Sequence, residues 1–190
     1  MTFRRGFKAE AERISLDIRS ELGLSTTDVL DVFALAKHLE IPALPMSALE
    51  SKNTNGMFRN FFTYQEQDSF SAVTVFNNRV RIIVHNESHH PNRQASNIAH
   101  EISHCLLEHE PAPLISEAGC RHWDSVLEME ADWLGAALLV PREGGLCLLN
   151  QGQSITEIAR NYGVSETLCK WRLHQTGVIE QIKRTKRWKR

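Results

Sequence analysis

Two histidines placed four residues apart in a predicted helix constrain this chain more than any other feature. A helical pattern begins at Pro91 and runs to about Glu108, and two prolines close it a few residues later. Inside it, residues 100–104 form an HExxH motif whose histidines are His100 and His104. Positions i and i+4 lie one above the other on a helix, so both imidazoles project to the same side and can bind one metal ion.

Glu101 follows the first histidine of the motif directly. In zinc peptidases a carboxylate at this position accepts a proton from the water on the metal and then passes it to the leaving amine. The competing interpretation is two histidines on a helix surface beside an incidental glutamate. Apolar residues around the motif, among them Ala99, Ile102 and Leu106, favour a largely buried helix and count against that interpretation.

A catalytic zinc ion needs a third protein ligand and one open coordination position, and a second predicted helix offers two candidates. This helix runs from about Ser125 to Val140 and is closed by Pro141. Glu128 lies on it 24 residues after the second histidine. Glu130 is the alternative, rotated by about 200° from Glu128 on an ideal helix, so only one of them can face the metal. We favour Glu128.

Two neighbours bear on the role of Glu128. Asp132 lies one helical turn further on and suits the outer shell, where it would orient a ligand histidine by accepting the distal N–H. Ser125 and Glu128 also have the spacing of a capping box, in which the glutamate closes the start of the helix. One carboxylate cannot fill both roles, so the capping alternative stays open on the sequence alone.

The rest of the first 150 residues predicts a scaffold of helices and a small sheet. Amphipathic spacing predicts one helix over residues 7–22 and another from about residue 27 to just before Ile41. Residues 72–84 predict a β-hairpin, because β-branched runs flank two asparagines that tolerate positive φ. Residues 56–62 are a weaker candidate for a third strand.

The second predicted helix carries the most specific resemblance in the chain. Residues 128–141 follow the form ExxA(N/D)xxAxxLLxP, and together with the HExxH motif they look like the ImmA/IrrE family of metallo-endopeptidases. The likeness extends to residues 7–12, to the hairpin and to residues 164–173, and so covers most of the chain. Gly135, where the family usually has Ala, and Ser103, where Gly is common, are departures at positions that carry no chemistry.

The resemblance implies that His100, His104 and Glu128 are the ligands of a zinc ion (Zn2+) and that Glu101 is the general base. The architecture we expect is an α+β, zincin-like domain over residues 1–150, with a small antiparallel sheet. In such a domain the HExxH helix and the Glu128 helix face each other across the metal.

Members of this family are bacterial and phage proteins that commonly act on a partner transcription repressor or antitoxin. The resemblance therefore implies a protein substrate and a zinc-dependent endopeptidase. The alternative is a transcription regulator that binds DNA or protein and keeps the metal site without turnover. Glu101→Gln separates the two, because it should abolish cleavage in the first case and change nothing measurable in the second.

The segment 151–178 resembles a helix-turn-helix, with Gly163 at the turn and Ser165 opening the second helix. That second helix offers only Lys170 and Arg172 as cations, which is few for phosphate contacts. We therefore favour packing on the peptidase core, or contact with the substrate, over sequence-specific DNA binding.

A basic tail, residues 179–190, ends the chain and holds six Lys and Arg within its last eight residues. A frayed, solvated terminus is the favoured interpretation, but the tail keeps contact with nucleic acid open. The 42% hydrophobic and 24% charged content is typical of a globular protein and excludes a disordered chain.

Neither a signal peptide nor a membrane span is predicted. No run approaches the roughly 20 apolar residues that cross a bilayer, and the first ten residues are charged rather than secretory in character. We therefore expect a cytoplasmic protein without a membrane partner. Its four cysteines lack the close CxxC spacing of a zinc knuckle and are expected to be reduced thiols.

Five further histidines lie near the motif in the sequence, and one of them could stabilise the oxyanion formed on a scissile carbonyl. They are His85, His89, His90, His109 and His122. The sequence does not choose among them. His122, in the linker between the two ligand helices, is the first to test.

Overall fold

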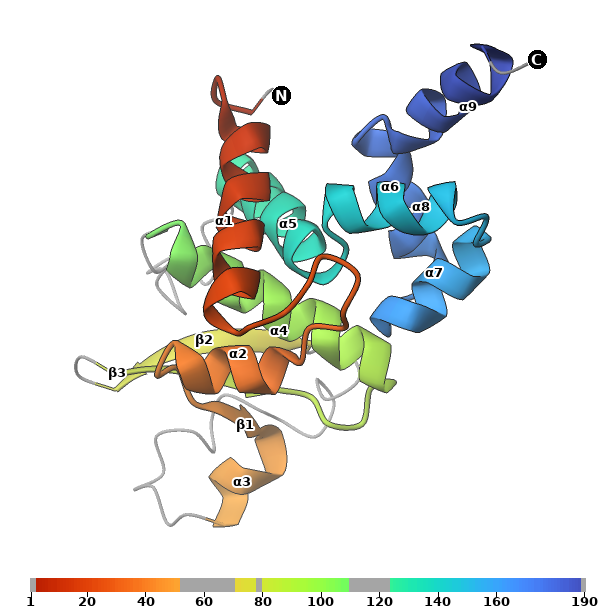
Figure 1. Ribbon diagram of the computed structural model, residues 1–190. Helices are drawn as coiled ribbons and strands as arrows, with labels where there is room; N and C mark the ends of the chain where they lie inside the picture. The colour runs from red at the N-terminus through yellow and green to blue at the C-terminus, as the bar shows by residue number, and fades with distance from the viewer. Residues whose placement is uncertain (1–2, 52–70, 78–79, 110–123, 189–190) are drawn as a thin grey trace.

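A computed structural model describes most of the 190-residue chain, namely residues 3–51, 71–77, 80–109 and 124–188. It combines helices with a small sheet, which confirms the expected α+β architecture (Figure 1). Helix α4 (Pro91–Leu106) carries the HExxH motif, and α5 (Ser125–Leu139) carries Glu128, close to the predicted bounds. Helix α1 (Phe7–Glu21) packs against α5.

The sheet has three described strands in the order β1-β3-β2. Strands β2 (Ala72–Asn77) and β3 (Val80–His85) pair antiparallel, which confirms the predicted hairpin. Strand β1 (Ala43–Pro45) pairs with β3 in parallel, so the sheet is mixed rather than antiparallel. Three residues are too few for an alternating pattern to predict. The strand suggested at residues 56–62 lies outside the described residues.

Helix α2 (Val32–His38) begins later than the sequence predicts, because a turn occupies the expected first residues. The Ser25 N–H donates to the Asp28 carboxylate at 2.7 Å, and Arg19 donates to the carbonyls of both residues. Asp31 then caps the helix through two backbone N–H groups. Local side-chain hydrogen bonds thus replace the first helical turn.

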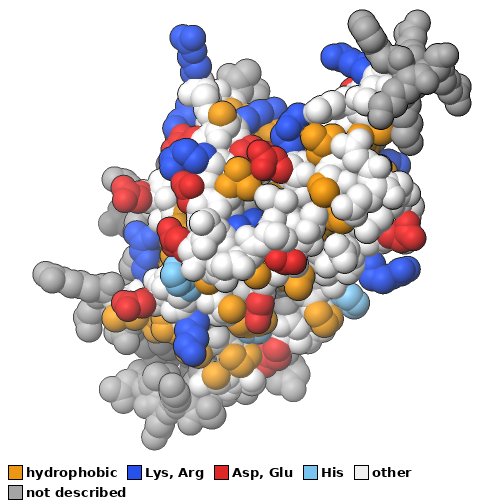
Figure 2. Space-filling model, in the orientation of Figure 1, with side chains coloured by type: hydrophobic (Ala, Val, Ile, Leu, Met, Phe, Trp, Pro, Cys, Tyr) orange, Lys and Arg blue, Asp and Glu red, His pale blue; other side chains and the backbone are white. Residues whose placement is uncertain are grey.

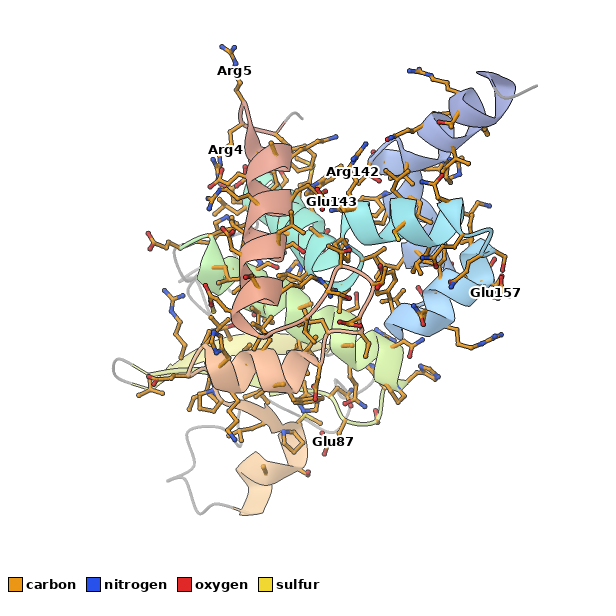
Figure 3. All side chains as sticks on the ribbon, viewed as in Figure 1. Arg4, Arg5, Glu87, Arg142, Glu143 and Glu157 are labelled. Atoms are coloured by element: carbon orange, nitrogen blue, oxygen red, sulfur yellow. The ribbon has the colours of Figure 1, made fainter. Side chains whose placement is uncertain are left out.

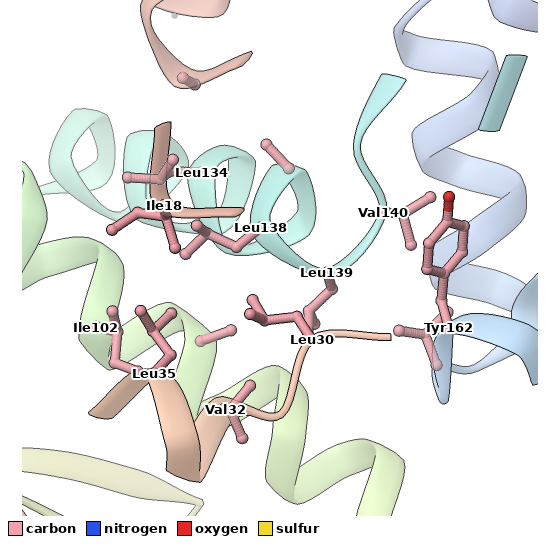
Figure 4. Close-up of a cluster of buried hydrophobic side chains, with 14 of the residues drawn as sticks. Ile18, Leu30, Val32, Leu35, Ile102, Leu134, Leu138, Leu139, Val140 and Tyr162 are labelled. Atoms are coloured by element: carbon pink, nitrogen blue, oxygen red, sulfur yellow. The ribbon is translucent and has the colours of Figure 1, made fainter. Parts of the chain in front are cut away.

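Helix α4 lies between the sheet and α5, with β2 and β3 on one side and α5 on the other. Helix α2 covers α4 as well, and the short α3 (Met46–Ser51) follows β1. Side chains such as Leu35, Ile102 and Leu138 meet in the core that these helices enclose (Figure 4). The core fixes the separation of the two helices that carry the motif residues.

Four helices follow: α6 (Arg142–Asn150), α7 (Ile155–Tyr162), α8 (Glu166–Gln175) and α9 (Val178–Trp188). Helices α7 and α8 lie within the predicted helix-turn-helix-like segment, with a short turn between them. Gly163 ends α7 with a φ of 64°, which favours glycine, and Ser165 caps α8. The boundary after residue 150 stays a prediction, but buried side chains on both sides of it belong to one core.

Helix α6 was not predicted, because Gly144 and Gly145 lie inside it. A Cβ atom at Gly144 would be 2.0 Å from the carbonyl oxygen of Thr26, so close packing requires glycine there. The basic tail is also more ordered than predicted, since α9 reaches Trp188 and buries Val178 and Ile182. Arg142, labelled in Figure 3, ties α6 to α9 through a 2.7 Å hydrogen bond to Gln181.

The described cysteines are Cys105, Cys147 and Cys169, and all three are free thiols. Burial raises the pKa of Cys169 to about 11. Cys120 lies outside the described residues. Among the described helices, none has both the length and the apolar character needed to cross a membrane.

Candidate metal centre

The two histidines of the motif lie side by side on α4, as the helical spacing predicts. Their ring centroids are 4.7 Å apart, and the Nε2 atoms of His100 and His104 are 3.0 Å apart. The side chains are 23% and 20% exposed, respectively. The pair therefore lies at the edge of the core, where one side can meet solvent.

Glu128 completes a three-residue group across the interface of α4 and α5. Its Oε2 is 3.3 Å from His100 Nε2, and its Oε1 is 3.7 Å from His104 Nε2. One potential ligand atom from each residue lies within 4.8 Å of the other two. The capping-box alternative is wrong, because Asp124 rather than Ser125 is the N-cap of α5.

The spacing of these donor atoms fits a small tetrahedral ion. Bonds of about 2.1 Å to zinc place two ligands of a tetrahedral site about 3.4 Å apart. The separations given above are 3.0, 3.3 and 3.7 Å. Two imidazoles and a carboxylate form the donor set of many catalytic zinc sites, whose fourth position stays open to water. The side chains of the group are between 20% and 25% exposed, which leaves room for such a position.

Asp132 contacts the distal nitrogen of His100, as the sequence predicts. Its Oδ1 is 2.9 Å from His100 Nδ1. Burial lowers the pKa of His100, but hydrogen bonds with Asp132 and Glu128 outweigh it and raise the pKa to about 9. Hydrogen bonds with the two histidines hold the pKa of Glu128 well below its usual range. The Glu128 carboxylate therefore stays ionised and favours a positive charge at the centre of the group.

Glu101 points from α4 toward the sheet, where it is 8% exposed. Thr74 of β2 donates a hydrogen bond from Oγ1 to Glu101 Oε2 at 2.7 Å. This contact fixes one oxygen of the carboxylate, Oε2. Sequence reasoning missed Thr74, because strand alternation places its side chain on one face of the sheet without showing which face meets α4.

Glu130, the alternative third ligand, lies elsewhere on α5. Its side chain is 6% exposed, with Oε2 3.5 Å from His109 Nε2 and Oε1 3.4 Å from Arg4 Nε. His109 in turn places its Nδ1 2.9 Å from His104 Nδ1. Burial, followed by the nearby His104, lowers the pKa of His109. His109 therefore lies behind the histidine pair and not at its open side.

Two of the other histidines considered from the sequence, His85 and His90, have separate surroundings. The ring of His85, buried on β3, lies 5.4 Å from the ring of Phe33. His90 caps α4 by accepting a hydrogen bond from Asn92 N. His122 lies outside the described residues, so its suggested role stays a prediction.

The two departures from the family pattern lie where α4 and α5 meet. A Cβ atom at Gly135 would be 3.2 Å from His100 N and 3.3 Å from the carbonyl carbon of Ala99. The Ser103 hydroxyl donates to the Ala99 carbonyl at 2.7 Å. Both positions concern helix packing beside the metal-binding group and not its donor atoms.

Comparison with known proteins agrees with this geometry. The model of a peptidase family, M78, described as the IrrE N-terminal-like domain, matches residues 62–174. The matched range is more than half of the chain and contains α4, α5 and the whole His-His-Glu group. The search of the curated proteins gives no match. On the strength of the family match, and in agreement with the ImmA/IrrE resemblance, this chain belongs to the IrrE N-terminal-like family of metallopeptidases.

Proposed function

We propose that the chain is a zinc-dependent endopeptidase in which His100, His104 and Glu128 hold the metal and Glu101 transfers protons. The observation that carries this proposal is the convergence of two imidazoles and a carboxylate from two helices within 4.8 Å. The group is partly exposed and has a buried carboxylate, Glu101, next to it in the motif. A structural site would instead be closed by four protein ligands.

A zinc ion at this group would polarise the scissile carbonyl and lower the pKa of the attacking water. With the metal held there, Glu101 would take up a proton at Oε1 and deliver it to the leaving amine, while Thr74 holds Oε2. Asp132 keeps the His100 ring oriented through its Nδ1 atom.

The substrate we propose is a regulatory protein, such as a cognate transcription repressor or an antitoxin. This proposal rests on the family resemblance. It requires a cleaved protein whose new terminus depends on Glu101.

Metal content tests the site first, because it needs no knowledge of the substrate. We expect about one zinc per chain by elemental mass spectrometry, and its loss in His104→Ala and in Glu128→Ala. Glu143→Ala is the matched control, since Glu143 is an exposed carboxylate at the start of α6 (Figure 3). No metal in the unaltered chain, or metal retained in both variants, contradicts the proposed site.

Cleavage is tested by comparing the new protein N-termini in cells that produce the unaltered chain or Glu101→Gln. The glutamine variant should keep zinc and the fold but lose the termini that the peptidase generates. Identical sets of termini, with zinc bound in both proteins, would favour the regulator without turnover.

The alternative function, a DNA-binding regulator, draws on the helix pair α7 and α8. Of the two cations of α8, however, Arg172 is 0% exposed, so Lys170 alone remains for phosphate contacts there. On the face in Figure 2, basic side chains are interspersed with acidic ones. A gel shift at low salt that disappears when residues 183–190 are removed would support non-specific binding through the tail, and no shift would exclude it.

A further inference from the structure

Hydrogen-bonding side chains continue behind His104, on the side away from Glu128. His109 Nδ1 is 2.9 Å from His104 Nδ1, and His109 Nε2 is 3.5 Å from Glu130 Oε2. The side chains of His109 and Glu130 are each only 6% exposed. The His109 imidazole and the buried Glu130 carboxylate therefore lie behind His104, which is one of the proposed ligands.

The geometry of His104, His109 and Glu130 indicates which ring nitrogens of the two histidines carry a proton. His104 Nε2 faces His100 and Glu128, so a metal bound there leaves the His104 proton on Nδ1. That N–H can donate to His109 Nδ1 only if His109 Nδ1 is unprotonated. His109 then carries its proton on Nε2, the atom nearest the Glu130 carboxylate. In this arrangement the His104 N–H meets an acceptor, and the His109 N–H faces the Glu130 carboxylate.

The backbone is bent to bring His109 into this place. Glu108, directly before it, has a φ of 54°, in the left-handed region that costs a non-glycine residue about 1 kcal/mol. The His109 N–H donates to the carbonyl of His104 at 3.0 Å. The chain thus turns directly after α4. This turn places the His109 ring beside the His104 ring, with ring centroids 5.0 Å apart.

We propose that His109 and Glu130 form a positioning relay that fixes the tautomer and ring orientation of His104 for metal binding. The relay rests on the proposed metal site. It serves His104 as Asp132 serves His100, but Asp132 is 69% exposed whereas the relay is buried. Arg4, which precedes α1 and is labelled in Figure 3, holds Glu130 less firmly, because it is half exposed and also pairs with Glu10.

Imidazole ¹⁵N NMR of the zinc-loaded chain tests the relay without any substitution. We expect His104 to be protonated at Nδ1 and His109 to be protonated at Nε2 alone. A proton on His109 Nδ1 overturns the relay, whatever the zinc affinity is. A chain that binds no zinc overturns the metal site together with the relay, so the two failures are distinguishable.

Two substitutions test the same contact by zinc affinity, measured in competition with a chromophoric chelator. His109→Leu removes the acceptor and should weaken binding by about 10- to 100-fold. His109→Asn should bring the affinity back to within about fivefold of the unaltered chain, since its Oδ1 takes the place of Nδ1. His85→Leu removes an equally buried imidazole from β3 and serves as the control. Equal losses in the Leu and Asn variants of His109 overturn the proposal.

Discussion

The metal-binding group and the junction of α5 with the C-terminal helices both contain polar side chains in or near the core. The polar side chains of the two regions, however, have different hydrogen-bond partners. At the junction, Arg19 and Arg172 are buried and donate to backbone carbonyls at the C-terminal end of α5. At the metal-binding group, His100, His104 and Glu128 face one another and the solvent.

This difference separates stability from binding. The last carbonyls of a helix lack intrahelical partners and carry partial negative charge, so buried arginines there stabilise the fold without any ligand. The two imidazoles and the carboxylate point at a shared centre that a cation would complete. We therefore expect changes at the junction to lower the free energy of unfolding, and changes at the metal-binding group to lower zinc affinity alone.

Arg172→Met should give the largest loss of stability at the junction. The guanidinium pairs with Glu12, donates to Val140 O at 3.2 Å and lies over the Trp133 ring. Removing it takes the buried cation away from Glu12, which keeps only its hydrogen bond from the Arg142 backbone N–H among the described contacts. We expect a loss of about 2–4 kcal/mol, since Glu12 is 22% exposed and partly rehydrates. Urea unfolding measures this loss.

The matched control is Arg160→Met, because Arg160 is exposed on α7 and should leave stability unchanged within about 0.5 kcal/mol. Zinc content should stay at one per folded chain in both variants. Loss of zinc in Arg172→Met without loss of stability would contradict the claim that the junction serves the fold and not zinc binding.

Asp132→Ala should show the opposite behaviour. The contact of Asp132 with His100 Nδ1 orients a proposed ligand, so we expect zinc affinity to fall by about 10- to 100-fold. The side chain is 69% exposed, so the metal-free chain should unfold at nearly the same urea concentration as before. Competition with a chelator measures the first quantity. A large loss of metal-free stability would show that Asp132 serves the fold.

Tyr162→Phe is a smaller test of the junction. The Tyr162 hydroxyl donates to the carbonyl of Thr26 at 2.8 Å and is held beside Gly144, where no side chain fits. The substitution keeps the buried ring and removes one hydrogen bond, so we expect a loss of about 1 kcal/mol with zinc binding unchanged. Asn161→Ala is the exposed control, and an equal loss there would assign the effect to the loop and not to the hydroxyl.

The sequence predicted the parts of the site that follow from helical spacing. His100 and His104 share a face because they are four residues apart, and Asp132 follows Glu128 by one turn. Thr74 and His109 could not be placed in this way. Their positions depend on which sheet face meets α4 and on the turn at Glu108, and neither has a periodic signal.

The fold was predictable to a similar extent. The hairpin and the long helices carry clear patterns, whereas β1 is too short for one. Helix α6 was missed because Gly144 and Gly145 have low helix propensity, which packing against Thr26 and Leu173 overrides. Similarly, the sequence predicted a solvated tail in place of α9, because the many Lys and Arg residues there obscure the apolar pattern of the buried Val178 and Ile182.

The smallest effect, and the one that tests whether the two regions are independent, is expected from Gly135→Ala. The new Cβ gains about 1 kcal/mol in helix propensity but lies 3.2 Å from His100 N, so α4 and α5 must separate by a few tenths of an ångström. The gain in helix propensity and the cost of the close contact oppose each other. We therefore expect the free energy of unfolding to change by less than about 1 kcal/mol. Because His100 and Glu128 lie on opposite sides of this contact, zinc affinity should fall only about two- to fivefold, less than in Asp132→Ala. Chelator competition and urea unfolding of the same preparation measure both. A loss of zinc affinity beyond about tenfold at unchanged stability would mean that the packing of α4 against α5, and not the outer-shell contacts, sets the geometry of the site.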